Sequence, residues 1–194
     1  MKPCLKLFLL ILVSIAFSGC AVRSGQTKKL DGYETKLKIL SVVYRDGKTA
    51  TDERMAKKLE RYNFQHIGDY MAKIVPPTFS SYGIAASFTS AQPTAPGTPD
   101  AKALQTLYIS PTKVSTTKHK DLELNTGPSA RPMKVEFEAY LFDPVVKREV
   151  WTGQFSVVVG GLLYDSFGEK KTAELVNAVI TGMKDDGLLE EIHP

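Results

Sequence analysis

The chain has 194 residues, 43% of them hydrophobic and 24% charged, with a formal net charge of +4 at pH 7. This length fits a single domain of ordinary size. A nucleic-acid-binding face would need clustered Lys and Arg with aromatic residues between them. The densest basic segment is Lys118-His119-Lys120, which is typical of a solvated loop or strand end, so the scattered charge excludes nucleic acid as a partner.

Residues 1–19 predict a signal peptide. Lys2 and Lys6 precede an almost uninterrupted apolar run at residues 7–18, which is the pattern of an export signal. As a helix, this run would cover about 18 Å, against roughly 30 Å for the hydrocarbon core of a bilayer. The segment is therefore predicted to be removed after export and not to remain as a membrane span.

The run closes with Phe17-Ser18-Gly19-Cys20, which resembles the lipobox of bacterial lipoproteins, with Phe17 in the place usually taken by Leu. The resemblance implies cleavage between Gly19 and Cys20 and attachment of acyl chains, palmitate among them, to Cys20. Several acyl chains would hold the protein durably at a membrane. The alternative is an ordinary secretory peptide, cut after Ser18 or Ala21, in which Cys20 has no role.

Cleavage after Gly19 would leave 194 − 19 = 175 residues and a formal charge of +4 − 2 = +2. The other cysteine, Cys4, lies in the removed segment, so the exported domain must fold without disulfides. In Gram-negative lipoproteins, Ala21 after the cysteine would favour sorting to the outer membrane. The expected location is therefore the cell envelope, on the periplasmic side of that membrane.

The next residues predict a tether followed by one α/β domain at residues 37–190. Residues 20–36 lack apolar periodicity and contain two glycines, so they are predicted to form a lipidated tether with a reach of about 20 Å. Residues 37–44 are apolar on both alternations, which predicts a strand near the middle of a sheet. A helix is then predicted from Thr49 or Thr51 to Ile74, ended by Pro76 and Pro77.

Strands dominate the central part of the chain. Residues 82–88 predict a short strand, and residues 89–101 predict a mobile Pro-rich loop. Residues 104–109 predict a strand ended by Pro111, and residues 113–124 a second, more polar one.

A hairpin follows. Residues 134–141 alternate apolar and polar side chains, as in a strand with one buried face. Asp143-Pro144 suits a type I turn, and residues 150–159 run back as its antiparallel partner. One face of this second strand carries Trp151, Gly153, Phe155, Val157 and Val159.

The last element predicted is a helix. Ser166-Phe167-Gly168-Glu169 has capping-box spacing, and Gly187 is a plausible terminator. The apolar stripe comprises Leu175, Val176, Val179, Ile180 and Met183. The predicted fold is α+β: a mainly antiparallel sheet of four to six strands with two amphipathic helices packed on one face.

The order of elements, with Leu141-Phe142-Asp143 leading through a turn to Trp151-Thr152-Gly153-Gln154-Phe155, resembles small α/β envelope lipoproteins. These include transport-auxiliary lipoproteins, synthase-activating lipoproteins and relatives of the TolB amino-terminal domain. The glycine common in their turn is missing here. The resemblance implies a protein that binds other proteins and is not an enzyme.

No motif predicts chemistry. His66, His119 and His193 lack metal-ligand spacing, so no metal or other cofactor is expected. A Gly-x-Ser-x-Gly motif is absent. Glu136 and Glu138 would lie about 7 Å apart on one strand face, but with Lys134 they form the polar alternation of that strand.

The leading hypothesis is a non-enzymatic, lipid-anchored envelope lipoprotein that binds another envelope protein or complex. Cys20 would attach the protein to the membrane through its acyl chains. Trp151 and Tyr140 are either core residues or interface residues, and they are the candidates for an interface because aromatic side chains are enriched at binding hot spots. The alternative is a periplasmic carrier of a small apolar ligand or lipid. An envelope hydrolase ranks third.

Overall fold

The structure is a computed structural model, and it describes residues 22–45, 57, 60, 63–91, 104–116, 132–159 and 166–190. The predicted signal peptide, Cys20, His119 and His193 lie outside the described residues. So do residues 92–101 of the predicted loop and residues 117–124 of the predicted polar strand.

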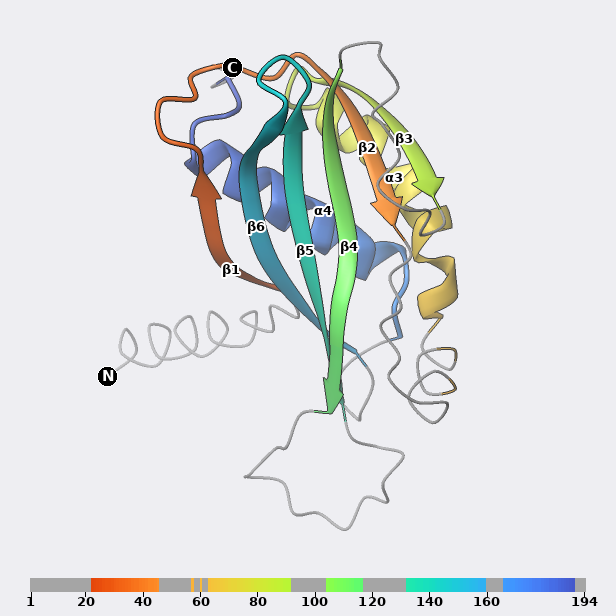
Figure 1. The fold of residues 1–194 in the computed structure, drawn as a ribbon. Coiled ribbons are helices and arrows are strands. Elements are labelled where there is room, and N and C mark those ends of the chain that lie inside the picture. Colours follow the sequence, from red (N-terminus) through yellow and green to blue (C-terminus); the bar gives the residue numbers. More distant parts are fainter. Residues whose placement is uncertain are drawn as a thin grey trace, which may run out of the picture.

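Six strands, two α-helices and one short 3-10 helix make up the described part of the chain (Figure 1). In chain order they are β1 Val22–Lys29, β2 Ile39–Arg45, η1 Phe64–His66, α3 Ile67–Ser80, β3 Ala85–Ala91, β4 Gln105–Thr116, β5 Met133–Asp143, β6 Arg148–Val159 and α4 Glu169–Asp185. No helix in the described ranges is long and apolar enough to cross a membrane.

The strands form one sheet in the order β1-β6-β5-β4-β2-β3. The pairs β1/β6, β6/β5 and β5/β4 are antiparallel, whereas β4/β2 and β2/β3 are parallel. The α+β class is therefore confirmed, but the prediction of a mainly antiparallel sheet is wrong, because the sheet is mixed. The parallel half arises because β2 and β3 are joined through helical chain, which lets β3 return in the direction of β2.

The segment predicted as a flexible tether is largely folded. Val22 pairs with Val157 and Lys29 with Trp151, so β1 forms the edge strand of the sheet beside β6. Tyr33 and Leu37, farther along this segment, are buried in the core. The tether prediction is therefore wrong from residue 22 onward, because backbone pairing with β6 holds a strand that has little apolar periodicity of its own.

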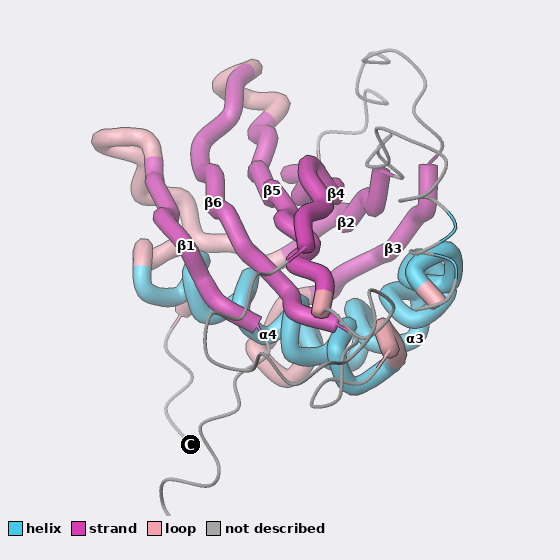
Figure 2. Tube along the Cα trace, turned by 90° about the horizontal axis from the view of Figure 1, so that it is seen from below, coloured by secondary structure: helices cyan, strands magenta, loops and turns pink. Residues whose placement is uncertain are grey.

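Both described helices cover the same face of the sheet (Figure 2). In α3 a stripe of four residues at intervals of four, Ile67, Met71, Val75 and Phe79, is buried against the sheet and α4. The stripe predicted for α4 is buried too. The core therefore lies in one layer between the helices and the sheet, and the opposite sheet face has no described helix on it.

Two prolines predicted to end elements lie inside them. Pro76 and Pro77 are within α3, which continues to Ser80. Each removes one backbone N–H from the helix, but the carbonyls that lose a donor belong to Ala72 and Lys73, which are exposed and open to water. Pro111 lies within β4 and not at its end, next to a register irregularity between Pro111 and Lys113 that accommodates it.

The predicted capping box of α4 is also wrong. Gly168 is the N-cap residue, and no side chain caps the helix. The hydroxyl of Thr172 donates to the Gly168 carbonyl over 3.0 Å instead. The predicted end of the helix is confirmed: Gly187 has a φ of +72°, and its N–H donates to the Lys184 carbonyl.

Candidate functional site

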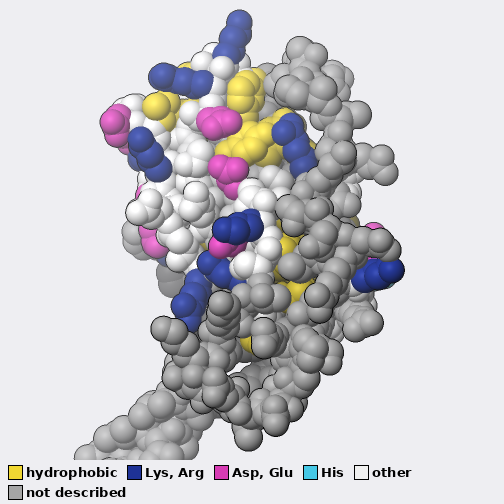
Figure 3. All heavy atoms as spheres, turned by 60° about the horizontal axis from the view of Figure 1, so that its bottom comes forward, with side chains coloured by type: hydrophobic (Ala, Val, Ile, Leu, Met, Phe, Trp, Pro, Cys, Tyr) yellow, Lys and Arg dark blue, Asp and Glu magenta, His cyan; other side chains and the backbone are white. Residues whose placement is uncertain are grey.

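The sheet face opposite the helices, here called the open face, carries the polar and charged side chains of the strands. Strand β5 shows why: its apolar residues alternate into the core, and its polar residues point the other way, as predicted. Figure 3 shows acidic and basic side chains beside a smaller hydrophobic area. Two groups of residues on the open face are distinct, an aromatic cluster and a polar groove.

The aromatic cluster consists of Arg45, Tyr108 and Tyr140, from β2, β4 and β5. The two tyrosine rings are stacked with centroids 4.7 Å apart, and the Arg45 guanidinium lies 4.0 Å from the centroid of the Tyr108 ring. Arg45 Nη1 also donates a hydrogen bond to the Tyr140 hydroxyl over 2.7 Å. Stacking and a cation–π contact together fix a half-buried group of side chains in which the Arg45 guanidinium covers one face of the Tyr108 ring.

Burial raises the pKa of Tyr140 above its ordinary value, although the charge of Arg45 opposes this shift. The phenol is therefore neutral at physiological pH. It is able to donate a hydrogen bond while accepting one from Arg45.

The polar groove has a volume of about 450 Å³ and lies over β1, β6, β5 and β4. Its charged lining residues are Arg23, Lys134, Glu136 and Glu138. Strand register places Arg23 beside Ser156, Ser156 beside Glu136, and Glu136 beside Lys113. One row across four strands thus alternates cations with an anion, which suits a polar partner surface better than an apolar ligand.

Glu136 is held in its ionised form by the lysines beside it. Lys134 Nζ lies 2.9 Å from Glu136 Oε1, and this hydrogen bond, together with the charges of Lys134 and Lys113, holds the pKa of Glu136 below its ordinary value. A general acid at neutral pH needs a raised pKa. The interpretation of these glutamates as the polar side of a strand agrees with this direction.

Of the two predicted interface residues, the structure places only Tyr140 on the open face. Trp151 is 1% exposed, so its interpretation as a partner-facing residue is corrected. Its ring packs beside Phe155, and its indole Nε1 donates to Asp186 at the end of α4 over 2.6 Å. A Cβ at Gly153 would lie 2.8–2.9 Å from these two rings, so the glycine makes room for them.

A buried hydrogen-bond network surrounds Asp143 at the β5–β6 turn. Asp143 is 3% exposed and accepts from the Tyr33 hydroxyl over 2.5 Å, from Gln105 Nε2 over 3.0 Å and from the Val145 N–H over 2.8 Å. Burial opposes ionisation of Asp143, but these hydrogen bonds outweigh it and lower its pKa. Burial and the bond to Asp143 raise the pKa of Tyr33 to about 12. This network joins three distant segments through one carboxylate.

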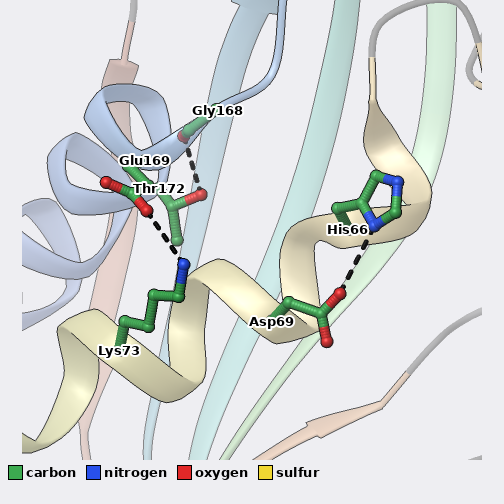
Figure 4. Close-up of polar contacts among 6 residues, drawn as sticks. All are labelled: His66, Asp69, Lys73, Gly168, Glu169 and Thr172. Atoms are coloured by element: carbon green, nitrogen blue, oxygen red, sulfur yellow. Dashed lines mark hydrogen bonds and ion pairs between the residues drawn. The ribbon is translucent and has the colours of Figure 1, made fainter.

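His66 and the ion pairs of the helices belong to η1, α3 and α4, and the two α-helices cover the other face of the sheet (Figure 2). Figure 4 shows the contacts of these residues. His66 Nδ1 is 3.3 Å from Asp69 Oδ2, and both side chains are exposed. Lys73 of α3 pairs with Glu169 of α4 over 3.2 Å. Within the described residues, no group of three or more His, Cys, Asp or Glu side chains is arranged to hold a metal ion.

Sequence reasoning missed Arg45 and Tyr108 as members of the site. The usable signal was the alternation of β4, which puts Tyr108 on the face opposite Leu107 and Ile109. No local sequence pattern indicates that Arg45 lies beside Tyr108, because β2 and β4 are far apart in sequence and are brought together only by parallel strand pairing.

The molecule is thus an α+β domain with one helix-covered and one open sheet face. No protein-family model and no curated protein matches its sequence.

Similar solved structures include a PelC dodecamer from Paraburkholderia phytofirmans, with a TM-score of 0.40, 16% identity and coverage of 83% of this chain and 96% of that one. Protein XCC0632 from Xanthomonas campestris, of family DUF330, has a TM-score of 0.37, 14% identity and coverage of 83% and 94%. Lipoprotein GNA1162 from Neisseria meningitidis has a TM-score of 0.31, 17% identity and coverage of 77% and 99%. These TM-scores are below 0.5, and the similarities identify neither a family nor a function for this chain.

Proposed function

We propose that this protein is a non-enzymatic lipoprotein of the cell envelope, anchored through acyl chains on Cys20 to the periplasmic side of the outer membrane. Its role is to bind another envelope protein through the open face. The sequence Phe17-Ser18-Gly19-Cys20 supports the anchor, and the geometry of the sheet supports the binding role.

The aromatic cluster is the observation that carries the binding role. Tyr and Arg are enriched at the energetic centres of protein interfaces. The tyrosine ring offers a large contact area with two rotatable bonds, and the planar guanidinium of Arg offers several hydrogen-bond donors and stacks on aromatic rings. Here Tyr108, Tyr140 and Arg45 hold one another in place before any partner arrives. A pre-organised surface loses less side-chain entropy on binding.

The carrier alternative would require an apolar cavity between the helices and the sheet. At that place the rings of Phe64, Phe137 and Phe167 pack together with centroids 5.7–6.2 Å apart. Most residues that line the groove on the open face are instead charged or polar, although Phe137 and Phe155 also contribute to it. These features favour a binding surface over a ligand cavity.

The anchor is tested by replacing Cys20. We expect Cys20→Ala to abolish labelling by a palmitate analogue and to move the protein from the membrane fraction to the soluble fraction, because the acyl chains would have no attachment site. A Cys4→Ala variant is the matched control and should remain in the membrane. Unchanged fractionation of the Cys20 variant would contradict the anchor.

Binding is tested with a photo-reactive aromatic residue at Tyr140 in the full chain, expressed in its own cells. We expect a cross-linked adduct with one envelope protein, and Arg45→Ala should lower its yield about fivefold to tenfold, equivalent to ~1–1.4 kcal/mol. The same probe at Tyr70, on α3, is the control. Equal adducts at both positions, or none at Tyr140, would contradict binding through the open face.

A further inference from the structure

Four exposed aliphatic side chains gather at one end of the sheet. In the described part of the chain, the large hydrophobic residues that are exposed are Val145 (80%), Ile39 (53%), Leu104 (43%) and Val146 (43%). Ile39 begins β2, Leu104 directly precedes β4, and the two valines lie in the β5–β6 turn. We call these four residues the end patch.

The strand register brings these residues together. Leu40 pairs with Gln105, so the residues before them, Ile39 and Leu104, are neighbours at the start of β2 and β4. Thr106 pairs with Phe142, which places Leu104 beside the turn that follows Asp143. Exposed apolar side chains that are scattered singly need no explanation, but several of them at the same end of neighbouring strands make a candidate interaction site.

The end patch is held rigidly. The Asp143 carboxylate binds the Val145 N–H and Gln105 Nε2, so one buried group fixes both the turn and the residue next to Leu104. The Tyr33 hydroxyl, donating to Asp143, adds the segment between β1 and β2. An exposed turn held by a buried network loses little conformational entropy when it docks.

The charges beside the end patch are mostly positive. Lys38 adjoins Ile39, and Lys147 and Arg148 follow Val146; all three are exposed, and the nearest acids along the chain are the buried Asp143 and the exposed Glu149. A second copy of this chain would bring the same cations face to face, which opposes self-association through this patch. A partner with carboxylates around an apolar centre is complementary to it.

The end patch also faces away from the proposed anchor. Val22 is two residues after Cys20, so at most about 7 Å of chain separates them. Figure 1 shows β1 beginning at the lower end of the sheet and the β5–β6 turn at the upper end. From Val157, the partner of Val22, to Arg148 the strand spans about 30 Å. A bilayer holding Cys20 is therefore not the natural occupant of the patch.

We propose that the end patch is a docking site for a protein surface that presents aliphatic side chains ringed by Asp or Glu. The proposal rests on the function proposed above and specifies the chemistry of the partner. The aliphatic side chains cover Val145, Val146, Leu104 and Ile39, and the carboxylates pair with Lys147, Arg148 and Lys38.

The test places a photo-reactive residue at Val145 in the full chain in its own cells, with Asp69 on α3 as the control position. The expected adduct is an envelope protein whose cross-linked peptide, read by mass spectrometry, contains aliphatic and acidic residues. The charge reversal Lys147→Glu with Arg148→Glu should lower the yield about tenfold. The matched reversal Lys170→Glu with Lys184→Glu, on exposed positions of α4, should leave the yield within about twofold.

Other results would overturn the proposal. These are an adduct with phospholipid, with a second copy of this chain or with its own residues 191–194, or a yield that does not respond to the charge reversal at Lys147 and Arg148. An adduct at Tyr140 without one at Val145 would reject the end patch and leave the proposed function standing. The absence of adducts at both positions would reject both. Circular dichroism of each variant checks that it is folded.

Discussion

At the scale of single residues, the Asp143 carboxylate joins three segments of the chain through hydrogen bonds. The sequence predicted that Asp143 would accept a backbone hydrogen bond in a turn, and the Val145 N–H does donate to it. The bonds from Tyr33 and Gln105 were not predictable, because these residues lie 110 and 38 positions away. A turn residue thus also serves as a buried junction between three segments.

The raised pKa of Tyr33 predicts a loss of stability at alkaline pH. The unfolded chain would release this proton near pH 10, whereas the folded protein retains it up to about pH 12. The stabilising contribution is therefore complete below pH 10 and disappears between pH 10 and 12. It amounts to at most about 2–3 kcal/mol.

The variant Tyr33→Phe tests this contribution by urea unfolding at pH 8, 10 and 11. We expect the variant to be less stable at pH 8 by about 1–3 kcal/mol, because Asp143 loses a donor. The difference from the wild type should then shrink as the pH rises, because phenylalanine has no proton to lose. A difference that stays constant across this range would contradict the prediction.

Trp151 shows a limit of reasoning about single residues. Its place on the apolar face of a strand was predicted, but that pattern did not decide between core and interface. Burial followed from the position of α4, where Gly182 permits close approach and Asp186, the residue after the helix, accepts the indole hydrogen bond.

At the scale of elements, the helices and strands with strong periodicity were predictable, and their ends were less so. The buried faces of β5 and β6 and the stripe of α4 follow from the sequence, because side chains on one face recur at a fixed period. The prolines at 76, 77 and 111 were misleading, because solvent on one side of α3 and a bulge in β4 accommodate them.

The prolines of α3 give a prediction at this scale. Pro77→Ala should stabilise the protein by about 1–2 kcal/mol, since a restored N–H would face the Lys73 carbonyl, although the unfolded chain gains some freedom. Pro144→Ala, in the turn after Asp143, should instead destabilise by about 0.4–1 kcal/mol, because proline suits that position. The midpoints of thermal unfolding measure both effects, and we expect a higher midpoint for Pro77→Ala and a lower one for Pro144→Ala than for the wild type. A lower midpoint for Pro77→Ala would contradict the prediction.

At the scale of the whole molecule, β1 shortens the chain between Cys20 and the folded domain. The predicted tether would have let the domain move freely about 20 Å from the bilayer. The observed strand pairs with β6 from Val22 onward, so the end of the sheet is next to the proposed anchor. The open face and the end patch then have defined directions relative to the membrane, provided that Cys20 is acylated.

Removal of β1 tests its structural role. We expect a chain that starts at residue 31 to be less stable than one that starts at residue 21 by at least about 2 kcal/mol, because β6 loses one of its two neighbouring strands and the Thr27 methyl leaves Gly182. Urea midpoints of the two purified proteins provide the measurement. Equal midpoints would mean that this segment acts only as a spacer.

The sequence by itself determined the α+β class, the buried faces of β5, β6 and α4, and the turn at Asp143. These features depend on neighbours within a few residues, so local periodicity and turn chemistry record them. Only the tertiary structure decided the mixed strand order, the inclusion of β1, the burial of Trp151 and the grouping of the end patch. Each of these depends on backbone pairing and packing between distant segments, and no local pattern encodes which distant segment supplies the partner.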